Sequence, residues 1–210
     1  LWIAALAILS VAVINLQRGA CVDDAYVSFV FARNLSQGAG LVFNSGERVE
    51  GYSNFLWVIM LGGPNRFLGV PIPDTAQALG ALLGILNVFL VFGLTRRVLG
   101  EANEKWAVAA AFLTAMDLRA ATWSVEGMET PLYLFFILAA IRLYIFQRWR
   151  WLWSIPALGA ALTRPEGPIL FGALAAHRVW VLIREKRSPH IADIGALAVF
   201  SIPYVAYTIW

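Results

Sequence analysis

Long apolar runs separated by short polar segments constrain this chain more than any other feature. The run over residues 74–95 carries a single charge, at Asp74, and further apolar runs follow it. A helix needs about 20 mainly apolar residues to cross the hydrocarbon core of a bilayer. Hydrophobic residues make up 60% of the chain and charged residues only 14%, against about 25% charged in soluble domains. The sequence therefore predicts an all-α, polytopic transmembrane bundle, because lipid-exposed backbone must satisfy its own hydrogen bonds.

The order of polar and apolar segments predicts one transmembrane module over 1–210. We expect a first helix over 1–16, an outer polar loop with an amphipathic helix over 17–54, and the remaining helices over 55–210. The later apolar runs cover 74–95, 106–118, 131–146, 152–162, 168–183 and 191–210. The chain begins without Met and stops within an apolar run, so we expect a fragment whose C-terminal part is missing.

The segment that follows the polar loop, "FLWVIMLGGPNRFLGVP", admits two interpretations. Gly62, Gly63 and Pro64 favour a broken helix that enters the membrane and returns, because glycine and proline interrupt helices. A plain crossing is the alternative. Under the re-entrant interpretation the basic clusters lie in the cytoplasm and the acidic loops face outward.

Charge and cysteine content exclude several function classes. The net charge of +3 comes from short basic clusters between apolar runs, a pattern that orients membrane helices and does not indicate a nucleic-acid partner. The chain has one cysteine, Cys21, so an internal disulfide and a thiolate metal cluster are both excluded.

Adjacent carboxylates, Asp23 and Asp24, open the outer polar loop at the start of the expected amphipathic helix. A carboxylate at a helix N-terminus gains about 0.3–1 kcal/mol from the helix dipole, so helix capping is one explanation. Two neighbouring carboxylates also repel each other and can recruit a cation. The pair alone leaves helix capping and an active site equally open.

Two further acidic motifs precede apolar runs. In "VEGYSNFLW", Glu50, Tyr52 and Asn54 lead directly into a membrane-entering segment, where carboxylates are disfavoured. In "WSVEGMETPLY", helix initiation explains Glu129, which stands two residues before a proline. That explanation does not extend to Glu126.

A third motif, "LTRPEGP", places Arg164 and Glu166 between two apolar runs. The guanidinium of an arginine matches phosphate oxygens in shape and charge, while a structural Arg–Glu ion pair is an equal alternative. Together the motifs suit a lipid-linked phosphate substrate. A carboxylate would take the proton of an acceptor hydroxyl, and cations would stabilise the departing phosphate.

The four blocks "VDDAY", "LVFNSGERVEGYSNFLW", "EGMETPLY" and "LTRPEG", in this order, resemble the polyprenyl-phosphate-dependent GT-C membrane glycosyltransferases. The resemblance is strongest to bacterial arabinofuranosyltransferase-like proteins and covers about residues 23–167. It implies a catalytic aspartate after the first helix, which we assign to Asp23, with Asp24 as its acceptor or metal partner. The blocks also supply the substrate-binding candidates, which are Glu50, Tyr52, Asn54, Glu126, Glu129, Arg164 and Glu166.

The resemblance further implies a function and a location. The donor would be a polyprenyl-phosphate sugar, with arabinofuranose one candidate, and the reaction would invert the anomeric centre. The acceptor would be a cell-envelope glycan, lipid or protein outside the bacterial inner membrane. No cofactor is implied with certainty, and a divalent cation at Asp24 stays open. The alternatives are a transporter or lipid flippase, which would hold its charges near the bilayer midplane, and an inactive scaffold subunit.

Overall fold

The computed structural model describes residues 2–44, 46–47, 51–146 and 151–209. Within these residues the regular elements are ten α-helices and one short 3-10 helix, and none is a strand. The all-α expectation is therefore confirmed for the described part of the chain. The chain divides into two compact units, Leu1–Phe135 and Phe136–Trp210, and each is described by itself.

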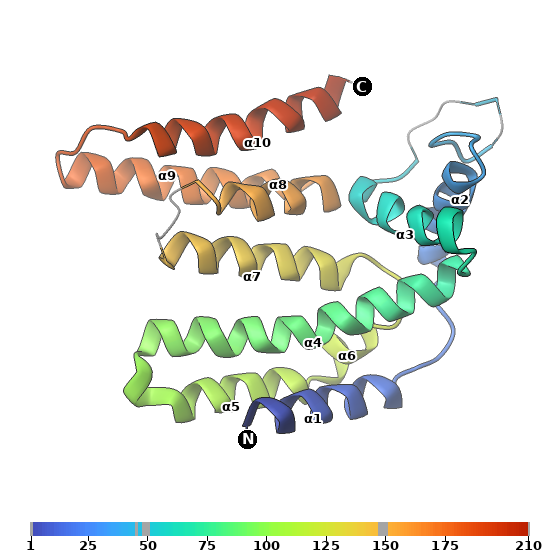
Figure 1. Cartoon of the computed structure of the whole chain (residues 1–210), viewed down its shortest axis with the longest axis horizontal. Helices are drawn as coiled ribbons and strands as arrows, with labels where there is room; N and C mark the ends of the chain where they lie inside the picture. The colour runs from blue at the N-terminus through green and yellow to red at the C-terminus, as the bar shows by residue number, and fades with distance from the viewer. Residues whose placement is uncertain (1, 45, 48–50, 147–150, 210) are drawn as a thin grey trace. The chain divides into compact units, whose positions relative to one another are not determined.

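The first unit is built around three helices that run side by side (Figure 1). Its elements are α1 (Trp2–Leu16), α2 (Asp23–Ser36), α3 (Phe55–Leu68), α4 (Ile72–Leu99), the 3-10 helix Glu101–Asn103, α5 (Glu104–Ala115), α6 (Leu118–Trp123) and the first turns of α7 (Thr130–Phe146). Helices α1, α4 and α5 form the row, and α2 packs on α3 beside the start of α4. The start of α2, which carries Asp23 and Asp24, and the connection from α6 to α7 therefore meet at one end of this unit.

Small residues allow the helices of this row to approach closely. Ala107, Ala111 and Ala115 recur every four residues along α5 and are buried against Val88 and Phe92 of α4. Residues four apart lie on one face of a helix, so this face of α5 is a continuous strip of methyl groups. The small side chains of α5 thus leave room for Val88 and Phe92 of α4 at the α4–α5 contact.

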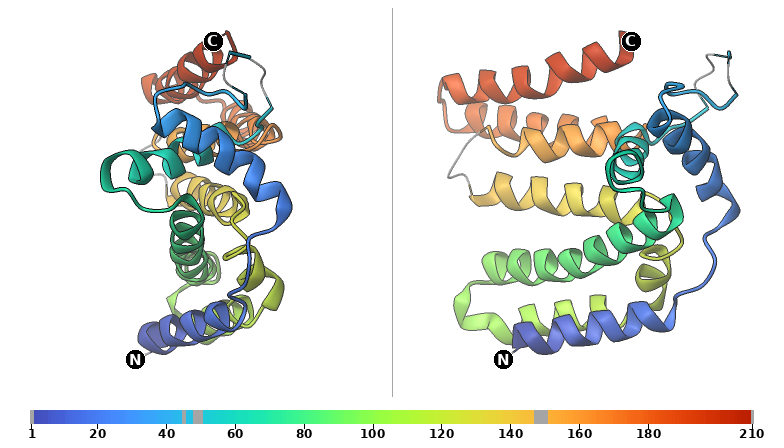
Figure 2. Two further views of the ribbon diagram at one scale, coloured as in Figure 1. Left: turned by 90° about the vertical axis from the view of Figure 1, so that its right-hand side faces the viewer. Right: turned by 45° about the vertical axis from the view of Figure 1, so that its right-hand side comes forward.

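The second unit contains the rest of α7 together with α8 (Ser154–Thr163), α9 (Pro168–Arg184) and α10 (Ile191–Ile209). Helices α8, α9 and α10 lie alongside one another in both views of Figure 2. Stacked aromatic rings join them, with ring centroids 5.2 Å apart for Trp153 and Phe171 and 3.8 Å apart for Phe171 and Phe200. Aromatic contacts thus form the core of this unit.

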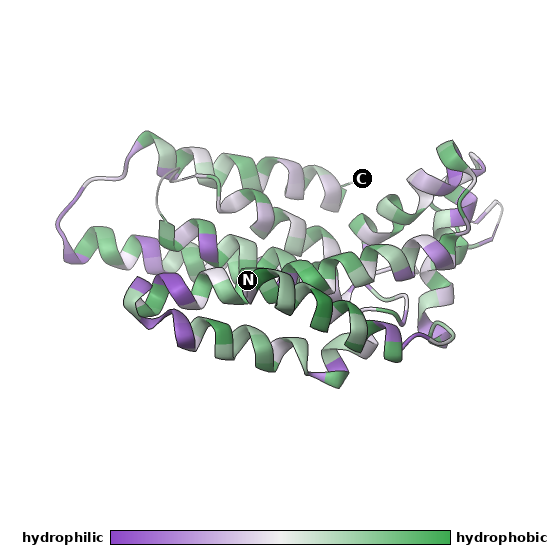
Figure 3. Cartoon of the chain, turned by 60° about the horizontal axis from the view of Figure 1, so that its bottom comes forward, coloured by the Kyte–Doolittle hydropathy of each residue, from purple (hydrophilic) through white to green (hydrophobic). Residues whose placement is uncertain are grey.

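Among the described residues, two helices are long and apolar enough to cross a membrane, α4 and α10. Only 28% and 11% of their most apolar windows are buried within the chain, so most of that apolar surface faces outward. Shorter apolar helices are α1, α7 and α8. In Figure 3 hydrophobic residues dominate the helices, and hydrophilic residues concentrate near helix ends and in the connections. These features indicate a membrane location.

The expected break at Gly62, Gly63 and Pro64 is wrong. Helix α3 continues through Pro64 to Leu68, and the chain turns at Gly69, whose φ of +67° is left-handed. Glycine adopts this conformation without the steric cost that a Cβ brings. Pro64 has no backbone N–H, so α3 continues through it without the hydrogen bond that residue 64 would otherwise donate to the Met60 carbonyl oxygen.

The expected helix over 106–118 corresponds to α5, which begins two residues earlier and ends three residues earlier. Helix α5 ends at Ala115, and a separate short helix, α6, begins at Leu118. The carboxylate of Asp117 accepts hydrogen bonds from the backbone N–H groups of Arg119 (2.9 Å) and Ala120 (3.4 Å). Asp117 is thus an N-cap, which starts a new helix within an otherwise apolar run.

Candidate functional site

The adjacent carboxylates lie on the first turn of α2. Asp23 and Asp24 are both exposed, and the N-cap position belongs to Val22. Within the described part of the chain, neither side chain makes a hydrogen bond or an ion pair. Capping of α2 by an aspartate side chain is therefore wrong as an explanation, although both charges still interact favourably with the helix dipole. Both carboxylates remain available to a ligand.

A tight turn between α6 and α7 anchors the start of α2. The backbone N–H of Val22 donates to the carbonyl oxygen of Glu126 (3.1 Å). The next residue, Gly127, has a φ of +89°, and a Cβ there would lie 2.9 Å from Phe29 Cζ and 3.1 Å from Cys21 Sγ. Only a residue without a side chain fits this contact. One backbone hydrogen bond and the close packing of Gly127 on side chains of this segment therefore hold the acidic turn beside the start of α2.

Gly127→Ala is expected to lower the free energy of unfolding by about 1–3 kcal/mol, the range for a strained backbone position. The alanine would combine a positive φ with overlap against Phe29. Thermal unfolding of the purified protein in detergent measures the loss. Gly69→Ala is the control, because Gly69 also has a positive φ but has open space around it. Equal losses in the two variants would contradict a role for the close approach.

A buried polar network holds the other side of this turn. Asn54 Nδ2 donates to Glu129 Oε2 (2.9 Å), and the Ser28 hydroxyl donates to Asn54 Oδ1 (3.2 Å). Each of the three residues is only 5% exposed. Trp57, which is fully buried, donates its indole N–H to the Gly127 carbonyl oxygen (3.0 Å). The network thus joins α2, α3 and the turn.

Tyr52 belongs to the aromatic packing over α2. Its ring is half-buried and stands edge-on to Phe31, with centroids 4.9 Å apart. Phe55 lies farther away, at 6.4 Å between centroids. Glu50, the remaining candidate of this motif, lies outside the described residues.

The connection between α1 and α2 is tied to α4 beside the same site. Gln77 Nε2 donates to the Gly19 carbonyl oxygen (2.9 Å) and to Cys21 Sγ (3.7 Å). Burial raises the pKa of the Cys21 thiol above its ordinary value of 9.0, and the negative charge of Asp74 raises it further, while the Gln77 hydrogen bond opposes both. Cys21 is therefore a protonated, weakly reactive thiol at neutral pH.

Alkylation of Cys21 by iodoacetamide is expected to require a higher pH in the folded protein than in the unfolded one. Because folding raises the pKa of the Cys21 thiol, the contribution of this group to the free energy of unfolding is complete below pH 9.0. That contribution is lost as the pH rises through the folded-state pKa. Cys21 is the sole cysteine, so mass spectrometry of labelled protein gives the rate at one site. Asp74→Asn should move the folded profile slightly towards that of the unfolded protein. Superimposable folded and unfolded profiles would contradict the raised pKa.

The two remaining candidates lie in the second unit, in the turn between α8 and α9. Arg164 Nη1 lies 3.7 Å from Glu166 Oε1, a long ion pair between partly exposed side chains. Gly167 packs so closely on the Ala160 carbonyl that a Cβ would overlap it. The structure thus contains the Arg164–Glu166 ion pair that the sequence offered as one alternative. A contact between Arg164 and a substrate phosphate stays a prediction.

Among the described candidates of the first unit, the structure brings Asp23, Asp24, Asn54, Glu126 and Glu129 into neighbouring segments, and these residues differ in exposure. Asp23 and Asp24 are open to solvent, and Glu126 is partly exposed in the turn that contacts their helix. Asn54 and Glu129 are buried and bonded to each other. The described residues include no group of three or more His, Cys, Asp or Glu that could hold a metal.

Sequence reasoning missed three uncharged residues that help to build the site. Ser28, Trp57 and Gln77 each make a hydrogen bond to another segment. Ser28 and Trp57 stand in ordinary helical positions, and their partners are 26 and 70 residues away. The glycine after Glu126 was the one local signal, since turns that need a positive φ favour glycine.

Comparison with known proteins finds a similarity to part of an enzyme that acts on carbohydrate. The chain is 31% identical over 206 residues to a terminal β-(1→2)-arabinofuranosyltransferase of Mycobacterium tuberculosis, an alignment that covers 91% of this chain. The chain spans 29% of that protein's length. No family model matches the chain, and no solved structure matches it. The chain is thus similar to part of a glycosyltransferase.

Proposed function

We propose that this chain is part of a polytopic GT-C glycosyltransferase that moves a sugar from a polyprenyl-phosphate donor to a cell-envelope acceptor. One observation supports this most: Asp23 and Asp24 are exposed, have no hydrogen-bond or ion-pair partner among the described residues, and lie on a helix that is anchored to a second acidic turn. The similarity to an arabinofuranosyltransferase over 91% of the chain supports the same class. An arabinofuranosyl donor is the first candidate on that ground.

In the proposed reaction Asp23 is the general base. Its carboxylate takes the proton from the acceptor hydroxyl, and the oxygen attacks the anomeric carbon of the donor sugar. The bond from that carbon to the phosphate oxygen breaks, polyprenyl phosphate leaves, and the configuration inverts. Asp24, one residue on, orients the acceptor or a cation. Both are exposed and hold no protein partner in the described part of the chain, as groups that meet a substrate require.

The other candidates divide into contact and positioning roles. Glu126 and Tyr52, which are partly exposed, are proposed to contact substrate, as are Glu50, Arg164 and Glu166. Asn54 and Glu129 are buried, so we assign them a positioning role. Their hydrogen bond holds the Glu126 turn against α2 and α3, which fixes the distance between the two acidic segments.

We propose that α4 and α10 cross the inner membrane and that the shorter apolar helices complete a multi-pass bundle. In the first unit the acidic connections meet at one end, which we place at the periplasmic or outer surface. A lipid-linked donor would then keep its chain between helices and present its phosphate there. The transporter alternative is less favoured, because Asp23, Asp24 and Glu126 lie in or beside connections, away from the helix middles where a transporter binds ions.

The test is sugar transfer by the full-length protein in proteoliposomes. Radiolabelled polyprenyl-phosphate donors carrying arabinofuranose, mannose or glucose are supplied with a cell-envelope glycan acceptor. We expect label in the acceptor from the arabinofuranose donor. Absence of transfer from every donor, with correctly folded protein, would refute the proposed reaction.

A further inference from the structure

An open groove of about 340 Å³ lies between α2, α3 and the start of α4. Tyr26, Val30 and Arg33 of α2 line it and are three to four residues apart, which is the spacing of one helix face. Asp23 stands three residues before Tyr26, so it starts the same face. The rest of the lining is Phe29 of α2, Gln37 at its C-cap, Asn65 of α3, and Ile72 and Pro73 of α4.

Arg33 and Gln37 give this groove hydrogen-bond donors that the chain does not use. Both side chains are exposed, and neither makes a hydrogen bond or an ion pair in the described part of the chain. A guanidinium has five N–H donors and no acceptor, and the glutamine amide adds two donors. The described residues that line the groove include no acid. The groove therefore suits an anion, and the planar guanidinium matches phosphate oxygens in particular.

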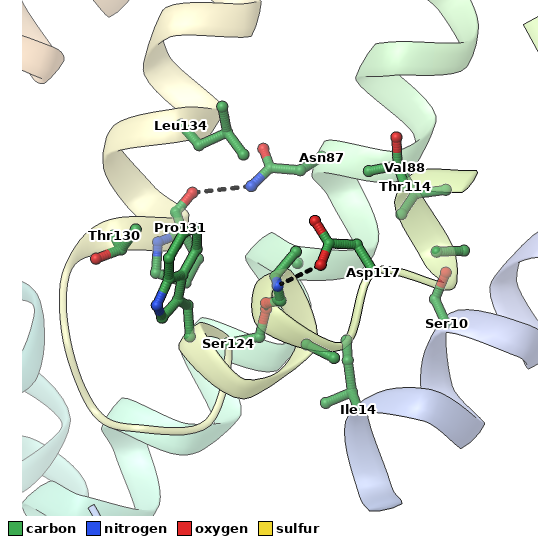
Figure 4. A pocket seen from close by; sticks show the side chains of 15 residues that line it. Ser10, Ile14, Asn87, Val88, Thr114, Asp117, Ser124, Thr130, Pro131 and Leu134 are labelled. Atoms are coloured by element: carbon green, nitrogen blue, oxygen red, sulfur yellow. Dashed lines mark hydrogen bonds between the residues drawn. The ribbon is translucent and has the colours of Figure 1, made fainter. Parts of the chain in front are cut away.

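A second cavity of this unit, of about 170 Å³, differs in this respect (Figure 4). Its Asn87 amide donates to the Pro131 carbonyl oxygen (3.0 Å), and its Asp117 carboxylate caps α6. The hydroxyls of Ser10 and Ser124 donate to carbonyl oxygens one turn earlier. These polar side chains serve the packing of the helices, so the groove is the better site for a ligand.

Hydrogen bonds between α2 and α3 hold the walls of the groove in place. The Ser36 hydroxyl donates to Asn65 Oδ1 (2.6 Å), and Arg66 Nη1 donates to the Ser36 carbonyl oxygen (3.1 Å). Asn65 Nδ2 in turn donates to the Val70 carbonyl oxygen (3.0 Å), in the connection to α4. Arg33 precedes Ser36 by three residues, so it stands on a braced end of α2.

The groove lies where α4 begins, which the proposed crossing by α4 places at the membrane surface. Ile72 and Pro73 are in the first turn of this 28-residue apolar helix. Shortly before them, at the end of α3, Phe67 and Leu68 are 80% and 76% exposed, and Arg66 precedes the two. Exposed apolar side chains beside a cation are typical of segments that insert at the boundary between headgroups and acyl chains. The α3–α4 connection therefore has the composition of an interfacial anchor.

Arg33 lies too far from Asp23 to hold the phosphate of the reacting donor. Ten residues along α2 separate the two, which corresponds to about 15 Å along the helix axis. Reacting atoms approach each other to about 3–3.5 Å, so the donor phosphate must lie beside the acceptor hydroxyl that Asp23 deprotonates. An anion at Arg33 must come from another molecule, and the phosphates at a membrane surface are those of lipid headgroups.

We propose that the groove binds the headgroup phosphate of an anionic phospholipid. Arg33 and Gln37 donate to the phosphate oxygens. The tip formed by Phe67 and Leu68 inserts among the acyl chains. A zwitterionic headgroup would bring an ammonium group for which the described lining has no carboxylate, so an anionic headgroup is favoured. The proposal rests on the proposed membrane-bound transferase, and it gives α2 a lipid that holds the general base at a fixed height on the membrane.

Native mass spectrometry of the full-length protein in detergent, titrated with dioleoylphosphatidylglycerol, tests this site. We expect the wild type to bind the lipid and Arg33→Gln to weaken that binding at least tenfold. Because Arg33 is exposed and has no partner in the described chain, Arg33→Gln should keep the wild-type melting temperature. Arg33→Lys keeps the charge without the planar fork and should lose less affinity. Arg119→Gln is the matched control, since Arg119 is an exposed arginine of the same unit that does not line the groove.

Equal affinities of the wild type and Arg33→Gln, or equal losses in Arg33→Gln and Arg119→Gln, would overturn the lipid site. Dependence on Arg33 that appears with undecaprenyl phosphate and not with phosphatidylglycerol would also overturn it, because the groove would then hold the donor. Asp23→Asn separates the two proposals, since it should lower transfer and leave phosphatidylglycerol binding unchanged. Lipid binding that depends on Arg33, in a protein that transfers no sugar, would refute the transferase and support the lipid site.

Discussion

Asp23→Asn is expected to lower the rate of sugar transfer by about 10²–10⁴-fold, the range for loss of a general base. Asparagine keeps the size of the side chain but cannot take the proton of the acceptor hydroxyl. Because Asp23 is exposed on the first turn of α2 and has no partner in the described chain, the substitution should leave the fold intact. Initial rates in proteoliposomes, with donor binding measured in parallel, check this.

Asp24→Asn is expected to have a smaller effect, expressed mainly as weaker acceptor binding. Glu104→Gln is the matched control, since Glu104 is also an exposed acid in the first turn of a helix, α5. A larger loss of transfer rate in Asp24→Asn than in Asp23→Asn would make Asp24 the general base and Asp23 the residue that orients the acceptor. Unchanged transfer in both variants would refute the catalytic assignment of the pair.

Glu129→Leu is expected to lower the free energy of unfolding by about 1–3 kcal/mol, the cost of leaving a buried polar partner unsatisfied. The partner is Asn54 Nδ2, which donates to Glu129 Oε2 and is itself buried. The Glu126 turn would lose one of its contacts to α3, so transfer should fall as well. Thermal unfolding in detergent and initial transfer rates measure the two effects.

Glu129→Gln separates shape from charge at the same position. The glutamine Oε1 can still accept from Asn54, so most of the stability should be retained. If transfer also survives, Glu129 is a positioning residue, as proposed. Wild-type stability with a loss of transfer as large as that of Asp23→Asn would instead place the Glu129 charge in the reaction.

Local sequence determined the helical class of this chain and the position of its exposed charges. The apolar runs predict helices because any other backbone would leave hydrogen bonds unmade in lipid, and the described residues contain helices without strands. Asp23 and Asp24 were identifiable because two adjacent carboxylates stand out in so apolar a chain. Their place at the start of a helix follows from the polar and apolar pattern after them.

Tertiary structure decided which polar groups are buried and which partners they have. The sequence placed Asn54 and Glu129 in the same group of substrate-binding candidates as Tyr52 and Glu126. In the structure Asn54 and Glu129 are instead hydrogen-bonded to each other across 75 residues of sequence. Asn87 lay unnoticed within an apolar run, although its buried side chain donates to the Pro131 carbonyl oxygen, 44 residues away. Periodicity reports which face of a helix is apolar, but a hydrogen bond between distant segments depends on how the helices pack, which no local pattern encodes.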